Sequence, residues 1–222
     1  MSIAIAIDGP AGAGKSTIEK LAAKELNFIY VDTGALYRTV GLAATLNNVE
    51  PKASPQVDEL LSKIKVELTF NDKNEQIVLL DGEDVSSKIR TPEASMMASA
   101  ISAVPSVRAY LLDLQRNIAK TNNVIMDGRD IGTVVLPNAQ IKIFLSANPE
   151  DRAKRRYDEL LEKGMDVKYE DILADVIERD YNDSHRDIAP LKPADDSIMV
   201  DTTGNTLEES VELLISIMKE NM

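Results

Sequence analysis

The chain has 222 residues and no cysteine, and its 37 acidic and 25 basic residues give a net charge of −12. The missing cysteines exclude disulfides, thiolate metal sites and a cysteine nucleophile. The acidic balance argues against a general nucleic-acid binder, which needs a basic face, and no apolar run approaches a membrane span.

The first predicted elements are a buried strand over residues 3–7 and a helix over 17–26, joined by a glycine-rich loop. The loop has the pattern G-x-x-x-x-G-K-[ST] of a P-loop, whose backbone N–H groups wrap a polyphosphate. Lys15 is placed to bridge the terminal phosphates, and the Ser16 hydroxyl can ligate Mg²⁺. The residues predicted to bind ATP here are Gly9, Pro10, Ala11, Gly12, Ala13, Gly14, Lys15, Ser16 and Thr17.

The start of the chain carries no sign of export. The first strand begins two residues after the start, without a basic segment and apolar stretch before it. We therefore expect no signal peptide and a cytoplasmic protein.

An inserted lobe is predicted over about residues 38–100. It follows a second buried strand at 28–31, begins within a helix at 35–44, and contains a short helix at 56–64. Strands at 66–70 and 76–80 alternate apolar and polar residues around a turn, which is typical of a small antiparallel sheet.

Three further buried strands are predicted at residues 124–126, 141–145 and 197–200. Two helices separated near Pro105 occupy 86–120, and later helices include one that carries a cluster of arginines and one at 207–218. Five apolar strands alternating with helices predict an α/β fold, with a five-stranded parallel sheet of the P-loop NTPase type and helices on both faces. We expect residues 1–222 to form one P-loop domain, with a mobile lid at about 155–170.

Asp127 follows a predicted strand, at the edge where parallel sheets build ligand sites. An acid there suits a partner for Mg²⁺, so Ser16 and Asp127 are the predicted metal residues.

Arginines gather in the last third of this acidic chain. Arg152, Arg155 and Arg156 share one helix face, and Arg179 and Arg186 flank Asp183. The planar guanidinium binds phosphate oxygens in pairs, so the pattern favours phosphate contacts over a merely solvated surface. His185, the single histidine, is not assigned as a general base, because phosphoryl transfer depends more on positioning and charge neutralisation.

Four separated motifs resemble the bacterial cytidylate kinase family and span nearly the whole chain. They are residues 8–17, 32–38, the Asp127-Gly128-Arg129-Asp130-Ile131-Gly132-Thr133 stretch, and a stretch from 179 to 191. The third is the most specific of them.

The resemblance implies transfer of the γ-phosphoryl group of ATP to CMP or dCMP, with Mg²⁺ as cofactor. It implies that Thr33, Arg38, Arg129 and Arg186 hold the CMP phosphate, that Ser99, Arg108 and Asp130 read cytosine, and that Asp183 faces the pentose. Lys15, Arg129 and Arg186 are the implied catalytic residues. Arg152 and Arg156 are assigned to ATP and Arg179 to CMP, within the lid region.

Two alternatives stay open. One is a P-loop kinase for another acceptor such as UMP, dTMP or AMP, and the other is a nucleotide-hydrolysing switch protein. We expect a monomer that binds small nucleotides and neither nucleic acid nor membrane.

Overall fold

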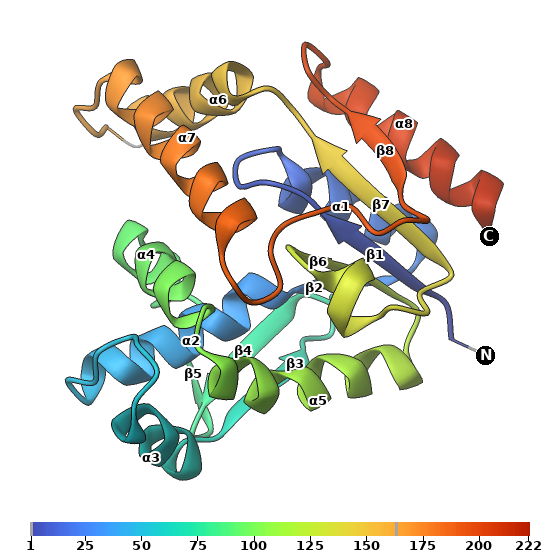
Figure 1. Ribbon diagram of the computed structural model, residues 1–222. Helices are drawn as coiled ribbons and strands as arrows, with labels where there is room; N and C mark the ends of the chain where they lie inside the picture. Colours follow the sequence, from blue (N-terminus) through green and yellow to red (C-terminus); the bar gives the residue numbers. More distant parts are fainter. Residues whose placement is uncertain (1, 163) are drawn as a thin grey trace. The chain divides into compact units, whose positions relative to one another are not determined.

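The computed structural model describes residues 2–162 and 164–222 (Figure 1). The chain folds into two compact units. The first unit comprises Ile29–Met126 with the N-terminal segment that ends at Ile3, and the second comprises Ala4–Phe28 and Asp127–Met222. Residue 163, inside the predicted lid, lies outside the described residues.

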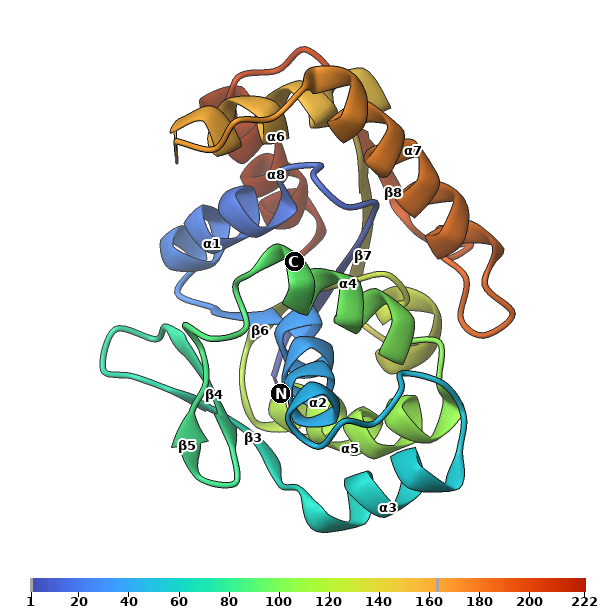
Figure 2. The same cartoon turned by 90° about the vertical axis from the view of Figure 1, so that its left-hand side faces the viewer.

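The first unit combines strands of the main sheet with a small antiparallel sheet and several helices. Its elements are β2 (Ile29–Asp32), α2 (Thr33–Leu46), α3 (Pro55–Lys63), β3 (Val66–Phe70), β4 (Gln76–Leu80), β5 (Glu83–Asp84), α4 (Pro92–Ile101), α5 (Pro105–Thr121) and the first three residues of β6 (Val124–Gly128). Three of these helices begin with proline, whose missing N–H is not needed in the first turn. Figure 2 shows the antiparallel sheet beside α2 and α3.

The antiparallel sheet confirms the predicted hairpin. Val66 lies opposite Leu80 and Phe70 lies opposite Gln76, and β5 adds a short edge strand. A buried apolar cluster joins Leu36 of α2 to Val78 of β4, Ile101 of α4 and Leu111 of α5. This cluster fixes α2 and α4 to each other, and these helices carry Thr33 and Ser99.

The second unit contains the remaining elements. They are β1 (Ala4–Asp8), α1 (Lys15–Leu26), the π-helical turn η1 (Ile131–Val135), β7 (Ile141–Ser146), α6 (Pro149–Glu162), α7 (Tyr169–His185), β8 (Ile198–Asp201) and α8 (Leu207–Asn221). β1 and β8 each pair with β7 in parallel. The main sheet has the order β2-β6-β1-β7-β8, which confirms the predicted five-stranded parallel sheet.

Two helix pairs complete the second unit. α1 contacts α8, and α6 and α7 form a hairpin (Figures 1 and 2). The hairpin has its own small apolar cluster around Ala153, Leu160 and Ile172, and Tyr157 meets Tyr169 edge to face. The hairpin is therefore packed internally as well as against its neighbours.

Most predicted elements are found within two residues of their expected ends. The hairpin strands coincide with β3 and β4, and the helices separated near Pro105 are α4 and α5. The sequence reading missed β5, which has two exposed residues, and η1. Within the part of the chain that the structure describes, no helix combines the length and the apolar character needed to cross a bilayer.

Candidate functional site

The P-loop joins the end of β1 to the start of α1. A Cβ atom on Gly9 would lie 2.0 Å from the carbonyl oxygen of Leu145 in β7, so no side chain fits at this position. Gly14 precedes α1 with φ 79°, a left-handed conformation that glycine adopts at little cost. The two glycines allow the loop to lie close to the sheet and to turn its N–H groups toward a ligand.

Lys15 is buried within this loop. Its Nζ donates to the carbonyl oxygens of Gly9 at 3.0 Å and Pro10 at 2.9 Å, and lies 3.6 Å from Oδ1 of Asp127. Burial lowers the pKa of Lys15, and the negative charge of Asp127 opposes that effect. The structure therefore brings together the predicted phosphate-binding lysine and the acid at the end of β6.

Ser16 and Asp127 offer hard oxygen ligands of the kind that Mg²⁺ prefers. Ser16 is exposed in the first turn of α1, and the Asp127 side chain is 13% exposed. Among the described residues there is no group of three or more histidine, cysteine or carboxylate side chains able to hold a metal. One hydroxyl and one carboxylate still fit Mg²⁺, because this ion keeps several waters and takes phosphate oxygens as ligands.

A second cluster of charges lies in the loop after β6 and on α7. The Nε atom of Arg129 donates to Oδ2 of Asp183 at 2.8 Å, and Nη2 of Arg186 lies 3.8 Å from Oδ1 of Asp130. Burial alone would raise the pKa of Asp183, but Arg129, Arg179 and Arg186 together hold this pKa below its usual value. The structure thus places five of the predicted acceptor-binding residues in one charged cluster.

The three clustered arginines of α6 have different surroundings. Arg152 is 2% exposed, and its guanidinium donates to the carbonyl oxygens of Ala147 and Ala11 and to both oxygens of Asp180. Arg155 donates to the carbonyl oxygens of Ala13 at 3.4 Å and Thr202 at 3.0 Å. Two arginines therefore contact the carbonyl groups of the P-loop.

Arg156 points elsewhere. Its side chain is 39% exposed and pairs with Glu159 on the same helix. The family resemblance assigned Arg156, but not Arg155, to ATP, although all three arginines share one helix face at this spacing. Only the contacts of the folded chain separate them.

In the first unit, Thr33 and Arg38 lie at the N-terminal end of α2. Thr33 is buried, and Asp32 caps the helix by accepting the N–H of Ala35 at 3.0 Å. The same carboxylate binds Nη2 of Arg38 at 2.7 Å. A helix N-terminus with an arginine one turn later suits an anion.

Ser99 and Arg108 both form a hydrogen bond with Ser102 in this unit. The Ser102 hydroxyl donates to the carbonyl of Ser99 at 2.8 Å, and Arg108 donates to the carbonyl of Ser102 at 3.2 Å. The Arg108 guanidinium also lies over the ring of Tyr37, 5.7 Å from its centre. The sequence could not show this proximity, because the two residues belong to different helices.

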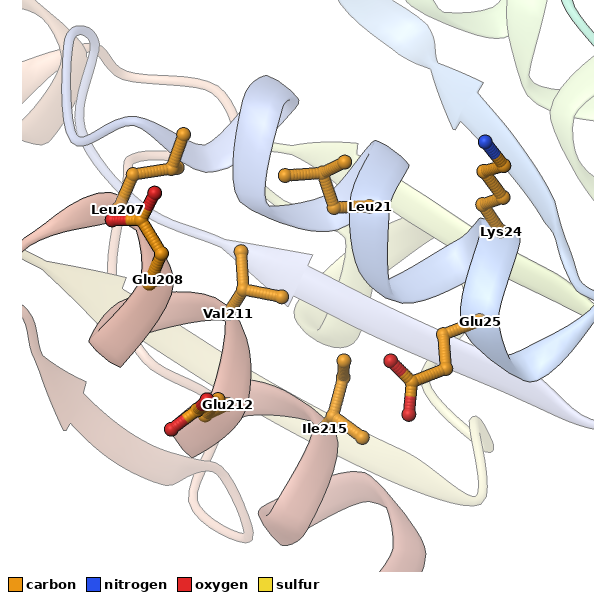
Figure 3. A pocket seen from close by; sticks show the side chains of 8 residues that line it. All are labelled: Leu21, Lys24, Glu25, Leu207, Glu208, Val211, Glu212 and Ile215. Atoms are coloured by element: carbon orange, nitrogen blue, oxygen red, sulfur yellow. The ribbon is translucent and has the colours of Figure 1, made fainter.

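A separate groove of about 530 Å³ lies between α1 and α8 (Figure 3). Leu21 faces Val211 and Ile215 across it, and Glu25, Glu208 and Glu212 are among the residues that line it. The groove contains none of the residues discussed above. Three glutamates and one lysine, Lys24, line it beside the apolar residues, so its charge does not favour a phosphate group.

Comparison with known proteins gives consistent matches over the whole chain. The family model described as cytidylate kinase matches residues 5–220. Cytidylate kinase of Caldicellulosiruptor bescii is 50% identical over 97% of this chain and 95% of its own length. Cytidylate kinase of Thermosipho melanesiensis is 48% identical, over 99% and 98%. A solved structure of a protein from Eubacterium ventriosum is similar in fold, with a TM-score of 0.53, 12% identity and coverage of 98% and 99%.

Proposed function

Because the chain belongs to the cytidylate kinase family, we propose that it transfers the γ-phosphoryl group of ATP to CMP and dCMP. The products are ADP with CDP or dCDP. The observation that carries the proposal is the pairing, in the second unit, of a P-loop with a cluster of arginines at Arg129, Arg179 and Arg186. A P-loop with a second group of arginines suits a kinase whose acceptor is itself a phosphate.

ATP binds to the backbone of Gly9–Thr17, and Lys15 neutralises charge on the transferred group. The support is the glycine-rich loop at the start of α1 and the position of Nζ against the loop. The family resemblance assigns Arg152 and Arg156 to ATP binding. The contacts of Arg152 with Ala11 and Asp180 favour a role in holding the loop that binds the phosphates.

Ser16 and Asp127 are the residues that would hold Mg²⁺. When bound, the ion supplies charge neutralisation at the β- and γ-phosphates. The chain's own contribution is a hydroxyl at the start of α1 and a carboxylate 3.6 Å from Lys15.

The family resemblance assigns the CMP phosphate to Thr33, Arg38, Arg129 and Arg186, includes Arg179 in CMP binding and assigns Asp183 to the pentose. Asp183 also orients the Arg129 guanidinium through its 2.8 Å hydrogen bond. Ser99, Arg108 and Asp130 read the base. Cytosine presents an amine donor beside a ring acceptor, and a carboxylate with an arginine offers the complementary pair.

Transfer needs no general base from the protein. The second pKa of a phosphate monoester is near 6, so the attacking oxygen of CMP is already ionised at neutral pH. This oxygen forms a bond to the γ-phosphorus while the bond to the β–γ bridging oxygen breaks, and the bridging oxygen leaves on ADP. Lys15, Arg129 and Arg186 stabilise the charge that develops during this step.

The proposed lid is the segment at about residues 155–170, where the end of α6 and the start of α7 meet in the hairpin. Its internal apolar cluster would let it move as a body, and closure would exclude water from the transfer. Amide hydrogen exchange in this segment is expected to slow with a bisubstrate analogue and much less with CMP alone. Equal protection in the free and doubly liganded protein would refute closure.

We also propose a cytoplasmic monomer that binds no nucleic acid. Light scattering on the purified protein measures the oligomeric state directly.

A coupled assay of ADP release against CMP, dCMP, UMP, AMP and dTMP tests the proposed acceptor. We expect fast turnover with CMP and dCMP and much slower turnover with the others. A preference for another acceptor would contradict the cytosine assignment. ADP release at the same rate without any acceptor would favour a hydrolysing switch protein.

A further inference from the structure

Asp8 is a buried carboxylate that contacts the loop after β6. It is the last residue of β1 and is 3% exposed. Its Oδ1 accepts the backbone N–H of Ile131 at 2.7 Å, and its Oδ2 accepts that of Gly132 at 2.8 Å. Both donors are in the first turn of η1, where N–H groups have no partner within the helix. One side chain therefore satisfies two amides of this turn.

The turn that Asp8 holds comes directly after the proposed acceptor-binding residues. Arg129 and Asp130 are the two residues before Ile131, and Asp130 is itself buried. A shift of the Ile131 amide would displace the backbone of Asp130. Asp8 thus sets the position of this segment although it is far from it in sequence.

The same turn is confined from a second side by Lys142. A Cβ atom on Gly132 would lie 3.3 Å from Oδ2 of Asp8 and 3.3 Å from Cδ of Lys142. Lys142 is held in turn by Asp196, whose two carboxylate oxygens lie 2.8 Å from its Nζ. The close fit leaves the amide edge of Gly132 little freedom to move.

This arrangement has an energetic cost. Burial raises the pKa of Asp8 to about 6, even though its two amide hydrogen bonds lower it. A neutral residue would avoid the desolvation of a carboxylate at this position. Asp8 also directly precedes Gly9, so the residue just before the P-loop is the one that holds the neighbouring loop.

We propose that Asp8 is a positioning residue for the acceptor nucleotide, which acts by fixing the Arg129–Asp130 segment relative to the P-loop. Asp8 touches neither substrate and works through the two amides of η1. The inference rests on the proposed roles of Arg129 and Asp130. Loss of the contact should weaken binding of the acceptor and recognition of its base while leaving ATP binding intact.

Asp8→Asn tests the proposal, because one oxygen is kept and the other becomes an NH₂ group that faces an N–H donor. We expect KM for CMP to rise about tenfold, equivalent to about 1.4 kcal/mol. The ratio of kcat/KM for CMP to that for UMP should fall, and KM for ATP should change less than about twofold.

Gly132→Ala provides a second variant that keeps the Asp8 carboxylate. The added methyl group presses on Oδ2 and on Lys142, so the same selective effect on CMP is expected in weaker form. Thr206→Ala is the stability control, since it removes the N-cap of α8, at a typical cost of about 1 kcal/mol. It should lower the melting temperature and leave both KM values unchanged.

Two results would overturn the proposal. One is an equal rise of KM for ATP and for CMP, which would make Asp8 a P-loop residue only. The other is a lower melting temperature with unchanged KM for CMP, as in Thr206→Ala. A wild-type protein that does not phosphorylate CMP would instead contradict the proposed function, so the two failures are distinguishable.

Discussion

Charged side chains of opposite sign alternate in the cluster around α7. Arg129 contacts Asp183, and Arg186 approaches Asp130. Burial would lower the pKa of Arg129, but the charges of Asp183 and Asp127 outweigh it and raise this pKa. The cluster therefore keeps its guanidinium groups charged and oriented before an anionic ligand arrives, which lowers the reorganisation that phosphoryl transfer requires.

Asp130→Asn tests the reading of the base. A carboxylate only accepts hydrogen bonds, so it favours the amine of cytosine and disfavours the carbonyl of uracil. CMP should lose about 1–3 kcal/mol of transition-state binding, the usual scale for one contact to a base edge. UMP should lose less, or gain. The measurement is the ratio of kcat/KM for the two nucleotides.

Asp187→Asn is the matched control for that prediction. Asp187 is exposed and directly follows Arg186, and this substitution removes the same charge as Asp130→Asn. The ratio of kcat/KM for CMP to that for UMP should not change. If Asp130→Asn lowers kcat/KM by the same factor for CMP and for UMP, Asp130 orients its neighbours and does not read the base.

The raised pKa of Asp8 predicts a specific dependence of stability on pH. Between the ordinary pKa of 3.8 and the folded value of about 6, the folded protein holds a proton that the unfolded chain has lost. The stability contributed by Asp8 therefore falls as pH rises through this window. The variant does not titrate at this position, so the difference in unfolding free energy between Asp8→Asn and wild type should shift in favour of the variant by roughly 3 kcal/mol as pH rises across the window, at about 1.4 kcal/mol per pKa unit.

Urea unfolding across this pH window measures the difference between the two proteins. Asp201→Asn is the control, because hydrogen bonds from Thr203 lower the pKa of this exposed carboxylate. Its contribution to stability is lost only as pH falls below 3.8, so the difference between Asp201→Asn and wild type should stay constant across this window. A constant difference between Asp8→Asn and wild type across the window would show that Asp8 does not titrate as described.

At the level of elements, α6 carries arginines of two kinds. Arg152 joins α6 to the P-loop and to α7, whereas Arg156 lies on the open side of the helix. Asp180 and Asp183 are three residues apart on α7. Asp180 forms an ion pair with Arg152, and Asp183 forms one with Arg129. α7 thus connects the P-loop region with the charged cluster.

Arg152→Ala should destabilise the protein strongly. Removal of one partner of a buried ion pair costs about 3–5 kcal/mol, and the partial exposure of Asp180 places the expected value at the lower end. Arg156→Ala should change stability by less than about 0.5 kcal/mol, as is usual for surface positions. Thermal unfolding of both variants provides the comparison, and similar melting temperatures would contradict the assignment.

The strands were predictable because each buried strand is a short apolar run between turn residues. The π-helical turn was not, since Ile131–Val135 has neither a helical nor a strand period. The order of the strands in the sheet could not be predicted either, because the hydrophobic pattern of a strand does not show which strands it pairs with. In the site, the motifs identified Lys15, Arg129 and Asp130. The contacts of Asp8 with Ile131 and of Arg155 with Ala13 join residues more than 100 positions apart, so the sequence could not show them.

At the level of the whole molecule, the acidic chain concentrates its arginines where phosphate is expected. The net charge of −12 keeps unspecific anions away, while local groups of arginine in each unit remain attractive to nucleotides. Each unit contributes one part of the proposed chemistry. Residues 29–126 contain Thr33, Arg38, Ser99 and Arg108, and the second unit contains the P-loop and the charged cluster.

The central claim is that the phosphoryl group passes from ATP to CMP and not to water. Phosphorus NMR of a reaction containing the protein, Mg²⁺, ATP and CMP identifies every product directly. We predict ADP and CDP in equal amounts, with no inorganic phosphate above the level of a control without protein. ADP together with inorganic phosphate and unchanged CMP would contradict the account.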